Sequence, residues 1–348
     1  MARRIVYDAL VFPVTREQVR EFRRTSTAGG SAFAAHSGGV VAVITIVIAG
    51  AVILFVTAPF VSLGLSAFSE NPNPVTGFFA LLPLITLGVI AFIAVQLFRN
   101  PGGWEKWMRL SNFATANGFL YSRVTSNPQF PGSIFALGSD RRSLDRIYTS
   151  EGRYLEISNY RYVTGSGKNR TTHDWGFMAL ALDRRLPHMV LDSTANNGLF
   201  GGSNLPTTFA KEQRLSLEGD FDRYFSLYAP KDYERDALYV FTPDLMALLI
   251  DEAAPFDVEI IDDWMFVYSS RPFAPADPAH FQRLFRIADT VGEKTLSQTD
   301  RYADDRIGDP AVNLVAPQGA RLKRGFSVGS VIVIVAVVMI WTWSFFIR

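Results

Sequence analysis

The sequence predicts an α+β cytoplasmic domain with an antiparallel sheet and flanking helices, tethered by three transmembrane α-helices. Two observations carry that prediction. The 348-residue chain is 48% hydrophobic with a formal net charge of +1, yet its charges are segregated, and three long stretches contain no Asp, Glu, Lys or Arg. The sequence between the second and third of these stretches alternates strand-like and helix-like patterns, as an ordinary globular domain does.

The three charge-free stretches contain apolar runs over 40–65, 78–98 and 326–347. Each run reaches the roughly 20 residues needed to cross a hydrocarbon core of about 30 Å. The first run is about twice as long as the apolar part of a cleaved signal peptide, so it predicts an uncleaved anchor. We therefore expect a multi-pass protein whose first partner is the lipid bilayer.

Basic residues flank these runs on one side. They occur in the N-terminal arm, after the second run and before the third, whereas the connection after the first run has one acid and no base. Because basic flanks are retained in the cytoplasm, the arm and the main domain are predicted to lie inside the cell membrane and the C-terminus outside. The flanking residues after the second run and before the third are Arg99, Lys106, Arg109, Arg321, Lys323 and Arg324.

The predicted organisation has five parts. They are a basic arm over 1–37, two spans with a short external loop over 38–100, a soluble α+β domain over 101–295, a polar linker over 296–325 and a third span over 326–348. From 101 to 320 the chain has 23 Lys and Arg against 29 Asp and Glu. That mildly acidic balance argues against nucleic acid as a partner. The absence of Cys excludes disulfides, thiolate metal sites and a Cys nucleophile.

Local signals predict three helices in the domain. One begins near Trp104 and stops at Asn117–Gly118. The second has Thr242 as its N-cap residue and Pro243 at its first position. The third begins at Asp277–Pro278. Aromatic residues at helical spacing before the second helix are predicted to be core; they are Phe221, Tyr224, Phe225 and Tyr228.

Two hairpins are predicted from runs of aromatic and branched residues. The first joins Arg153–Val163 to Asp174–Leu182 through a glycine-rich turn at 165–167. The second joins Phe256–Ile261 to Trp264–Tyr268 across Asp262–Asp263. Short strands are also expected at His188–Leu191 and from Leu215.

No motif for cofactor or metal binding survives inspection. Gly165-Ser166-Gly167-Lys168 lacks the spacing and the hydroxyl of a P-loop and lies between two strands, so it is predicted to be a hairpin turn. Gly198, Gly201 and Gly202 do not form a dinucleotide-binding motif. His188 and His280 have no His, Cys or acid at metal-ligand spacing. We predict no cofactor and no metal.

No catalytic residue is assigned either. His173 and Asp174 are adjacent, but neighbours on a strand point to opposite faces, which favours a structural role. The acidic pairs Asp262–Asp263 and Asp304–Asp305 are predicted to be a turn and a solvated linker. Gly325 and Gly329 form a GxxxG pattern that could pack within or between chains.

The N-terminal arm contains the one predicted contact surface. Thr15 and Gln18 match a capping box, and the helix that would follow sets four arginines on one side. They could contact anionic lipid or serve only to fix orientation, and the sequence favours the two readings equally. The four residues are Arg16, Arg20, Arg23 and Arg24.

One block resembles a known family. It contains Leu215-Ser216-Leu217-Glu218, then Phe221, Tyr224-Phe225, Tyr228, Glu234, Tyr239, Thr242-Pro243, Met246 and Leu249. The succession is similar to that of an uncharacterised family of bacterial membrane proteins, a domain of unknown function with two N-terminal spans and a cytoplasmic domain. The resemblance implies a multi-pass architecture, and it brings no functional residue because the family has no assigned activity.

Three functions remain open. A membrane-tethered, non-catalytic binding or scaffolding domain is favoured, with a protein partner or a second copy as its other expected partner. A membrane-bound hydrolase would need a site assembled only in the fold. A subunit of a transport assembly is disfavoured because the three runs contain no charge.

Overall fold

The computed structural model describes residues 4–28, 103–197, 203–217, 219–274, 277–309 and 311–325, with isolated positions at 66, 69, 70, 85, 88, 339 and 342. The chain divides into two compact units. One comprises Met1–Phe12 and Arg109–Arg348, and the other comprises Pro13–Met108. The sheet and the candidate site belong to the first unit.

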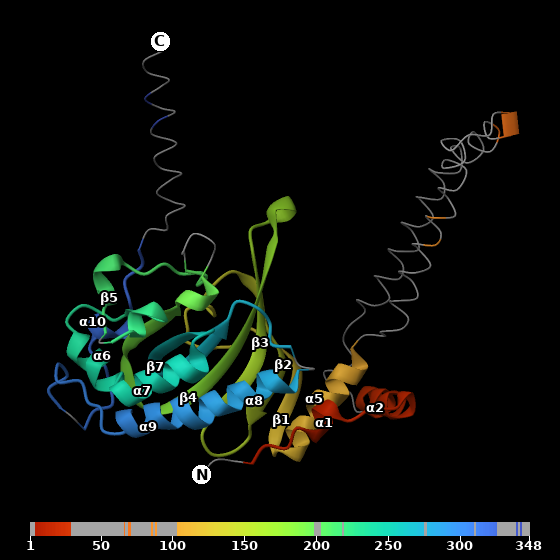
Figure 1. Cartoon of the computed structure of the whole chain (residues 1–348), viewed down its shortest axis with the longest axis horizontal. Coiled ribbons are helices and arrows are strands. Elements are labelled where there is room, and N and C mark those ends of the chain that lie inside the picture. The colour runs from red at the N-terminus through yellow and green to blue at the C-terminus, as the bar shows by residue number, and fades with distance from the viewer. Residues whose placement is uncertain are drawn as a thin grey trace. The chain divides into compact units, whose positions relative to one another are not determined.

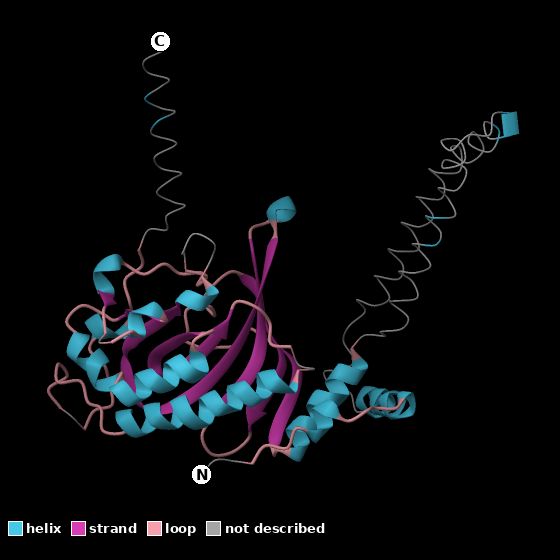
Figure 2. Cartoon of the chain, in the orientation of Figure 1, coloured by secondary structure: helices cyan, strands magenta, loops and turns pink. Residues whose placement is uncertain are grey.

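The first unit is built on a seven-stranded sheet whose neighbouring strands pair in antiparallel register. The strand order is β1-β2-β3-β4-β6-β5, and β7 also pairs with β4. Figure 2 shows helices lying across one face of this sheet. The strands are β1 Phe119–Ser126, β2 Ser139–Thr149, β3 Leu155–Thr164, β4 Thr171–Ser193, β5 Arg214–Leu215, β6 Phe225–Tyr228 and β7 Asp257–Ser269.

The 23-residue strand β4 organises the sheet. It pairs with β3 from Leu155↔Leu180 to Thr164↔Thr171, which confirms the first predicted hairpin. The tip of that hairpin, with a 3-10 turn at Gly167–Asn169, extends beyond the rest of the sheet (Figure 1). Gly165 and Gly167 there have φ of 76° and 54°, a conformation that glycine adopts at little cost.

The second predicted hairpin is wrong. The segment 257–269 is one strand, β7, which pairs with β4 along its length. Asp262 has φ of 53°, and the register with β4 shifts around it. Asp262 therefore marks a β-bulge rather than a turn, and a bulge lets a long strand bend without reversing.

The predicted helix starts at Trp104, Pro243 and Pro278 are confirmed. Their helices are α5 Trp104–Ala116, α7 Pro243–Leu248 and α8 Pro278–Ile287. Of the aromatic run, Phe221 and Phe225 are buried as predicted, whereas Tyr224 is exposed and Tyr228 is partly buried. The run is not helical, because it forms a 3-10 turn at Phe221–Arg223 followed by β6. The other helices among the described residues of the first unit are α1 Asp8–Val11, α6 Glu234–Val240, α9 Glu293–Thr299 and α10 Pro317–Ala320, with π-helical segments at Leu249–Ala253 and Ala288–Gly292.

The two faces of the sheet bury different cores. One face packs aliphatic and aromatic side chains against the helices, for example Leu191 against the side that Leu284 and Phe285 cover. The opposite face is strongly aromatic and is covered by the loop after β1, by residues 205–209 and by residue 322 rather than by helices. Its core residues include Phe135, Tyr160, Phe177, Phe209, Phe266, Tyr268 and Leu322.

The segment predicted as a polar linker, 296–325, is packed on the domain. Tyr302 and Leu322 are buried. Asp304 accepts hydrogen bonds from the Tyr233 hydroxyl at 2.6 Å and from the Ala316 amide at 2.9 Å. These contacts hold the pKa of Asp304 below its usual range although burial opposes the shift. Asp304 is therefore not the solvated surface residue that the sequence predicted.

In the second unit, the capping box of the arm is confirmed. The Thr15 amide donates to Gln18 Oε1 at 2.8 Å, and the Gln18 amide donates to Thr15 Oγ1 at 3.3 Å, at the start of α2 Arg16–Ala28. Phe22 lies against Trp104, with ring centroids 6.3 Å apart. The four arginines of the predicted contact surface, Arg16, Arg20, Arg23 and Arg24, are exposed.

The transmembrane part of the predicted fold class is wrong. Among the described residues, no helix is long and apolar enough to cross a membrane. In the described part of the chain, the longest unbroken helical stretch is 278–299. It carries charges along its length because it covers a sheet with one face and meets solvent with the other; they are Arg283, Arg286, Asp289, Glu293 and Lys294. The predicted runs 40–65, 78–98 and 326–347 lie outside the described residues apart from single positions. The prediction of a multi-pass membrane protein is contradicted by the same finding on the described helices.

Candidate functional site

A buried polar network occupies the aromatic face of the sheet. His188 on β4 and Glu259 on β7 are joined by a 2.7 Å contact between Nε2 and Oε1. The other carboxylate oxygen of Glu259 accepts from the Tyr268 hydroxyl at 2.7 Å and from the Ser133 amide at 2.8 Å. His188 Nδ1 accepts from the Leu322 amide at 3.0 Å. The ring therefore carries its proton on Nε2 and donates it to Glu259.

This network is closed. Burial alone would raise the pKa of Glu259, but hydrogen bonds from His188, Ser133 and Tyr268 outweigh burial and lower it. The same carboxylate keeps the pKa of Tyr268 well above its usual range, after burial, which is the larger cause. Both nitrogens of His188 are occupied, so the imidazole has no lone pair to offer a substrate. The network joins two sheet strands to the loop after β1 and to the C-terminal segment, and its role is structural.

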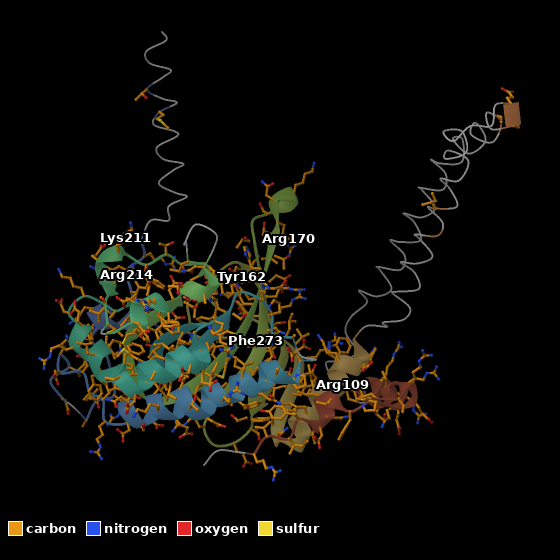
Figure 3. All side chains as sticks on the ribbon, in the orientation of Figure 1. Arg109, Tyr162, Arg170, Lys211, Arg214 and Phe273 are labelled. Carbon is orange, nitrogen blue, oxygen red and sulfur yellow. The ribbon has the colours of Figure 1, made fainter. Side chains whose placement is uncertain are left out.

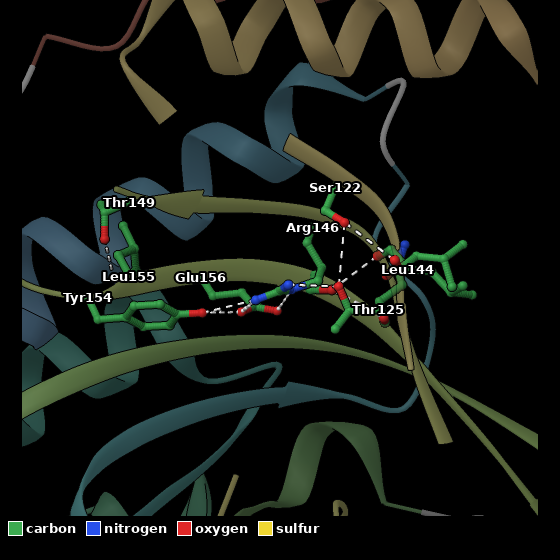
Figure 4. A network of polar contacts seen from close by, with 11 residues as sticks. Ser122, Thr125, Leu144, Arg146, Thr149, Tyr154, Leu155 and Glu156 are labelled. Carbon is green, nitrogen blue, oxygen red and sulfur yellow. Dashed lines mark hydrogen bonds and ion pairs between the residues drawn. The ribbon is translucent and has the colours of Figure 1, made fainter. Parts of the chain in front are cut away.

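A second satisfied network lies between β1, β2 and β3 (Figure 4). Arg146 makes a bidentate pair with the fully buried Glu156, at 2.8 and 2.7 Å, and reaches Thr125 Oγ1 at 2.8 Å. The Tyr154 hydroxyl donates to Glu156 at 2.5 Å. Burial would lower the pKa of Arg146, but its bonds to Glu156 prevail and raise it. Arginine suits this place because its planar fork matches a carboxylate.

A third polar group, here called the Asp257 cluster, lies where β4 ends and β7 begins. It comprises Asp192, Asn196, Asn204 and Asp257. Leu191 pairs with Val258 in antiparallel register; Asp192 follows Leu191 and Asp257 precedes Val258, so the two acids lie opposite each other and face the same side of the sheet. Asp257 is 0% exposed and Asp192 is 4% exposed.

Few donors reach these two carboxylates. Asp257 Oδ1 accepts from the Ser193 amide at 2.8 Å, and Asp192 Oδ1 accepts from the Ser203 hydroxyl at 2.9 Å. Burial raises the pKa of Asp257 to about 7, with Asp192 adding to the rise and the Ser193 amide and nearby Asn196 and Asn204 opposing it. Burial likewise raises the pKa of Asp192 to about 6, against the opposing effects of Ser203 and Arg214.

Arg214 does not neutralise this pair. It is an exposed residue of the edge strand β5, close to Lys211 (Figure 3). It also acts on Tyr228, whose pKa is raised by burial and by Asp192 and lowered by Arg214. Because a charge at the solvent boundary is screened, the two carboxylates are left with weak compensation inside the sheet.

Unpaired polar atoms gather in this cluster. Among the described residues, the buried side-chain atoms without a hydrogen-bond partner include the acceptors Asp257 Oδ2, Asn196 Oδ1 and Asn204 Oδ1 and one donor, Asn204 Nδ2. The Asn196 amide nitrogen, in contrast, donates to the Pro255 carbonyl at 3.4 Å, which directs its oxygen elsewhere. The cluster therefore holds an excess of unused acceptors in a region from which water is largely excluded.

The sites weighed from the sequence lie elsewhere. The glycine-rich segment at 165–168 is the exposed hairpin tip, as predicted. His173 Nε2 lies 2.8 Å from Thr164 Oγ1, whereas Asp174 pairs with Arg161 at 2.6 Å, so this His and Asp have separate partners. His280 forms an exposed contact with Asp277 at 3.3 Å.

Two of the remaining glycine patterns fall partly or wholly outside the described residues. Those are Gly198, Gly201 and Gly202, and Gly329. Gly325, the first glycine of the GxxxG pattern, donates its amide to the Thr208 carbonyl at 2.8 Å. A side chain at Gly325 would meet the Phe209 backbone at 2.6 Å, so close approach of two backbones explains this glycine.

The sequence did not reveal either buried acid of β7. His188 was judged to lack an acidic partner because Glu259 lies far away in the chain. A usable signal was present: Asp257 and Glu259 alternate with Val258 and Ile260 in an apolar strand, so both acids point to the same face. Two acids on one face of a buried strand require partners or a ligand.

No group of three or more His, Cys, Asp and Glu side chains that could hold a metal ion occurs in the described part of the chain. The Asp257 cluster has only two such residues, and its other oxygens belong to amides. A set of two carboxylates and side-chain amide oxygens differs from a His, Cys, Asp and Glu group, and it suits hard cations rather than zinc or iron.

Comparison with known proteins gives little. No family model matches the chain and no curated protein matches it. It is similar in structure to a solved protein described as the crystal structure of the mycobacterial trehalose monomycolate transport factor A, TtfA, at 13% sequence identity and a TM-score of 0.36, covering 57% of this chain and 93% of that chain. A likeness at this level carries no argument about function. The resemblance to an uncharacterised family stays a prediction.

Proposed function

We propose that this chain is a non-catalytic binding domain that holds a small, positively charged or hydrogen-bond-donating ligand at the Asp257 cluster. The carrying observation is the gathering of unpaired buried acceptors around Asp257. A buried polar atom left without a partner costs about 1–3 kcal/mol. A ligand that donates to several of these atoms recovers that free energy on binding, and this gain supports affinity at the cluster.

The enzymatic alternative has less support. A hydrolase needs a nucleophile next to a base with a free lone pair. His188 is fully bonded, and Ser193 donates its hydroxyl to the Ala254 carbonyl and accepts from the Ala195 amide at 3.2 Å. The groups that could do chemistry are thus already engaged in structural bonds.

The test uses the full chain, stripped with a chelator, at pH 8. Thermal unfolding is followed with calcium, magnesium or the organic diamine putrescine added at matched ionic strength. At least one probe should raise the midpoint in the native chain and have no effect on Asp257→Asn. Asp305→Asn, which changes an exposed acid, should respond like the native chain. The proposal is wrong if no probe raises the midpoint, or if Asp257→Asn responds as fully as the native chain.

A further inference from the structure

We infer that the Asp257 cluster is a binding site for a hard divalent cation of the calcium class. This inference rests on the proposed function, since it names the ligand of that site. Its geometry is a pair of buried carboxylates, facing each other across β4 and β7, beside side-chain amides whose oxygens have no partner in the described part of the chain. The fully buried Asp257 contributes the unpartnered carboxylate oxygen, Oδ2.

The available ligand atoms are all oxygens. They come from two carboxylates and from the amides of Asn196 and Asn204. Oxygen donors of this kind suit calcium and magnesium, whereas zinc, copper and iron favour nitrogen or sulfur. The chain has no Cys, and the nearby His188 uses both ring nitrogens in the closed network. Soft and borderline metals are therefore disfavoured at this place.

Charge separates a divalent cation from an organic ammonium. Two ionised aspartates carry two negative charges in a site that Arg214 compensates weakly. A divalent cation neutralises both charges at once, but a single ammonium leaves one of them buried and unpaired, which is costly.

Ligand flexibility separates calcium from magnesium. Calcium accepts six to eight oxygens in irregular arrangements, while magnesium demands near-ideal octahedral geometry and gives up its waters reluctantly. Here the donors come from a strand start, a 3-10 turn at Thr194–Asn196 and a position 12 residues after Asp192, at Asn204. Donors from such different backbone settings suit the more tolerant ion.

The experiment is isothermal titration calorimetry on the chelator-treated full chain, with calcium, magnesium and putrescine as separate titrants. Calcium should bind once per chain and at least tenfold more tightly than magnesium. Asp257→Asn and Asp192→Asn should each weaken calcium at least tenfold, Asn204→Asp should tighten it, and Asp305→Asn should not change it. Circular dichroism shows that each variant is folded, and Asn204→Ala gives a second, milder loss if an aspartate variant is not.

The outcomes separate the two proposals. Binding of putrescine without calcium would overturn the cation site and leave the proposed function standing. No binding by any titrant would overturn both. Calcium binding that is unchanged in the aspartate and Asn204 variants would locate the cation elsewhere and overturn the inference.

Discussion

Glu259 and Asp257 lie two residues apart on β7 and face the same side of the sheet, yet their pKa values move in opposite directions. Both side chains are essentially inaccessible to solvent. Glu259 accepts bonds from His188, Tyr268 and the Ser133 amide, whereas Asp257 accepts from the Ser193 amide and has an unpaired oxygen. The number of donors, and not the degree of burial, decides which acid stays ionised.

The comparison of Glu259 with Asp257 also distinguishes a structural polar network from a candidate binding site. At Glu259 the protein supplies every partner that an ionised carboxylate needs, and the result is a cross-link between segments. At Asp257 the protein supplies an incomplete set, and the remaining acceptors are free for a ligand. Removing a side chain should therefore have a large effect on stability at the first place and a pH-dependent effect at the second.

The largest expected effect is the loss of the closed network. Glu259→Ala should lower the free energy of unfolding by about 3–5 kcal/mol, since it leaves His188, Tyr268 and the Ser133 amide without their common acceptor. Urea unfolding followed by tryptophan fluorescence measures this, because Trp264 lies in the sheet. Glu212→Ala, at an exposed acid, is the control and should change little. A loss below about 1 kcal/mol would mean that the network contributes little to stability.

The next effect concerns pH. A carboxyl whose pKa is raised in the folded state costs stability as it ionises, so stability falls as pH rises from the unfolded pKa towards the folded one. For Asp257, from 3.8 to about 7, the native chain should lose roughly 2–3 kcal/mol between pH 5 and pH 8 without cations. Glu259 acts in the opposite sense, because its pKa is lowered and its stabilisation is lost only in acid.

Asp257→Asn should flatten that dependence while keeping an acceptor for the Ser193 amide. Urea unfolding at pH 5, 6, 7 and 8 in chelator provides the measurement. Parallel pH profiles for the native chain and the variant would show that Asp257 is ionised throughout this range, contrary to the contrast drawn here.

The smallest expected effect repeats the contrast between satisfied and unsatisfied polar groups at two helix starts. Asp277 accepts from the Ala279 amide at 2.9 Å, but Thr242 makes no capping bond and its buried Oγ1 is unpaired. Asp277→Ala should therefore cost about 1 kcal/mol, while Thr242→Ala should cost under about 0.5 kcal/mol. Equal costs in urea unfolding would show that the Thr242 hydroxyl does cap its helix in solution.

Features with short-range signals could be predicted from the sequence. The capping box at Thr15 and Gln18, the helix starts at Pro243 and Pro278, and the hairpin at 165–167 depend on residues within a few positions of one another. The helix start at Thr242 was predicted correctly, although the expected side-chain cap was not formed. The Thr-Pro pattern at Thr242–Pro243 therefore predicted where the backbone becomes helical, but the preference of Thr for the N-cap position did not predict a side-chain hydrogen bond.

Features that depend on distant pairing could not be predicted in this way. The alternation around Asp262–Asp263 is compatible with a turn or with a bulge, and the partner strand β4 decides between them. The aromatic spacing at Phe221–Phe225 matches a helix, but strand pairing with β4 prevails at β6. The candidate site needs residues from two strands and the loop between β4 and β5, so its membership appears only in the fold.

The bond from the Leu322 amide to His188 also has a consequence for the order of events during synthesis. β4 can pair with β7 only after β7 is synthesised, and His188 can accept its bond from the Leu322 amide only after that segment is synthesised. A ribosome that has released residues through Ser269 has therefore exposed a sheet whose helix-covered face still lacks α8 and α9 and whose aromatic face still lacks the segment around Leu322. Such a nascent chain presents unburied apolar surface for the time needed to add the last fifty or so residues, on the order of 3–10 s at about 5–20 residues per second, and is a natural client for a chaperone.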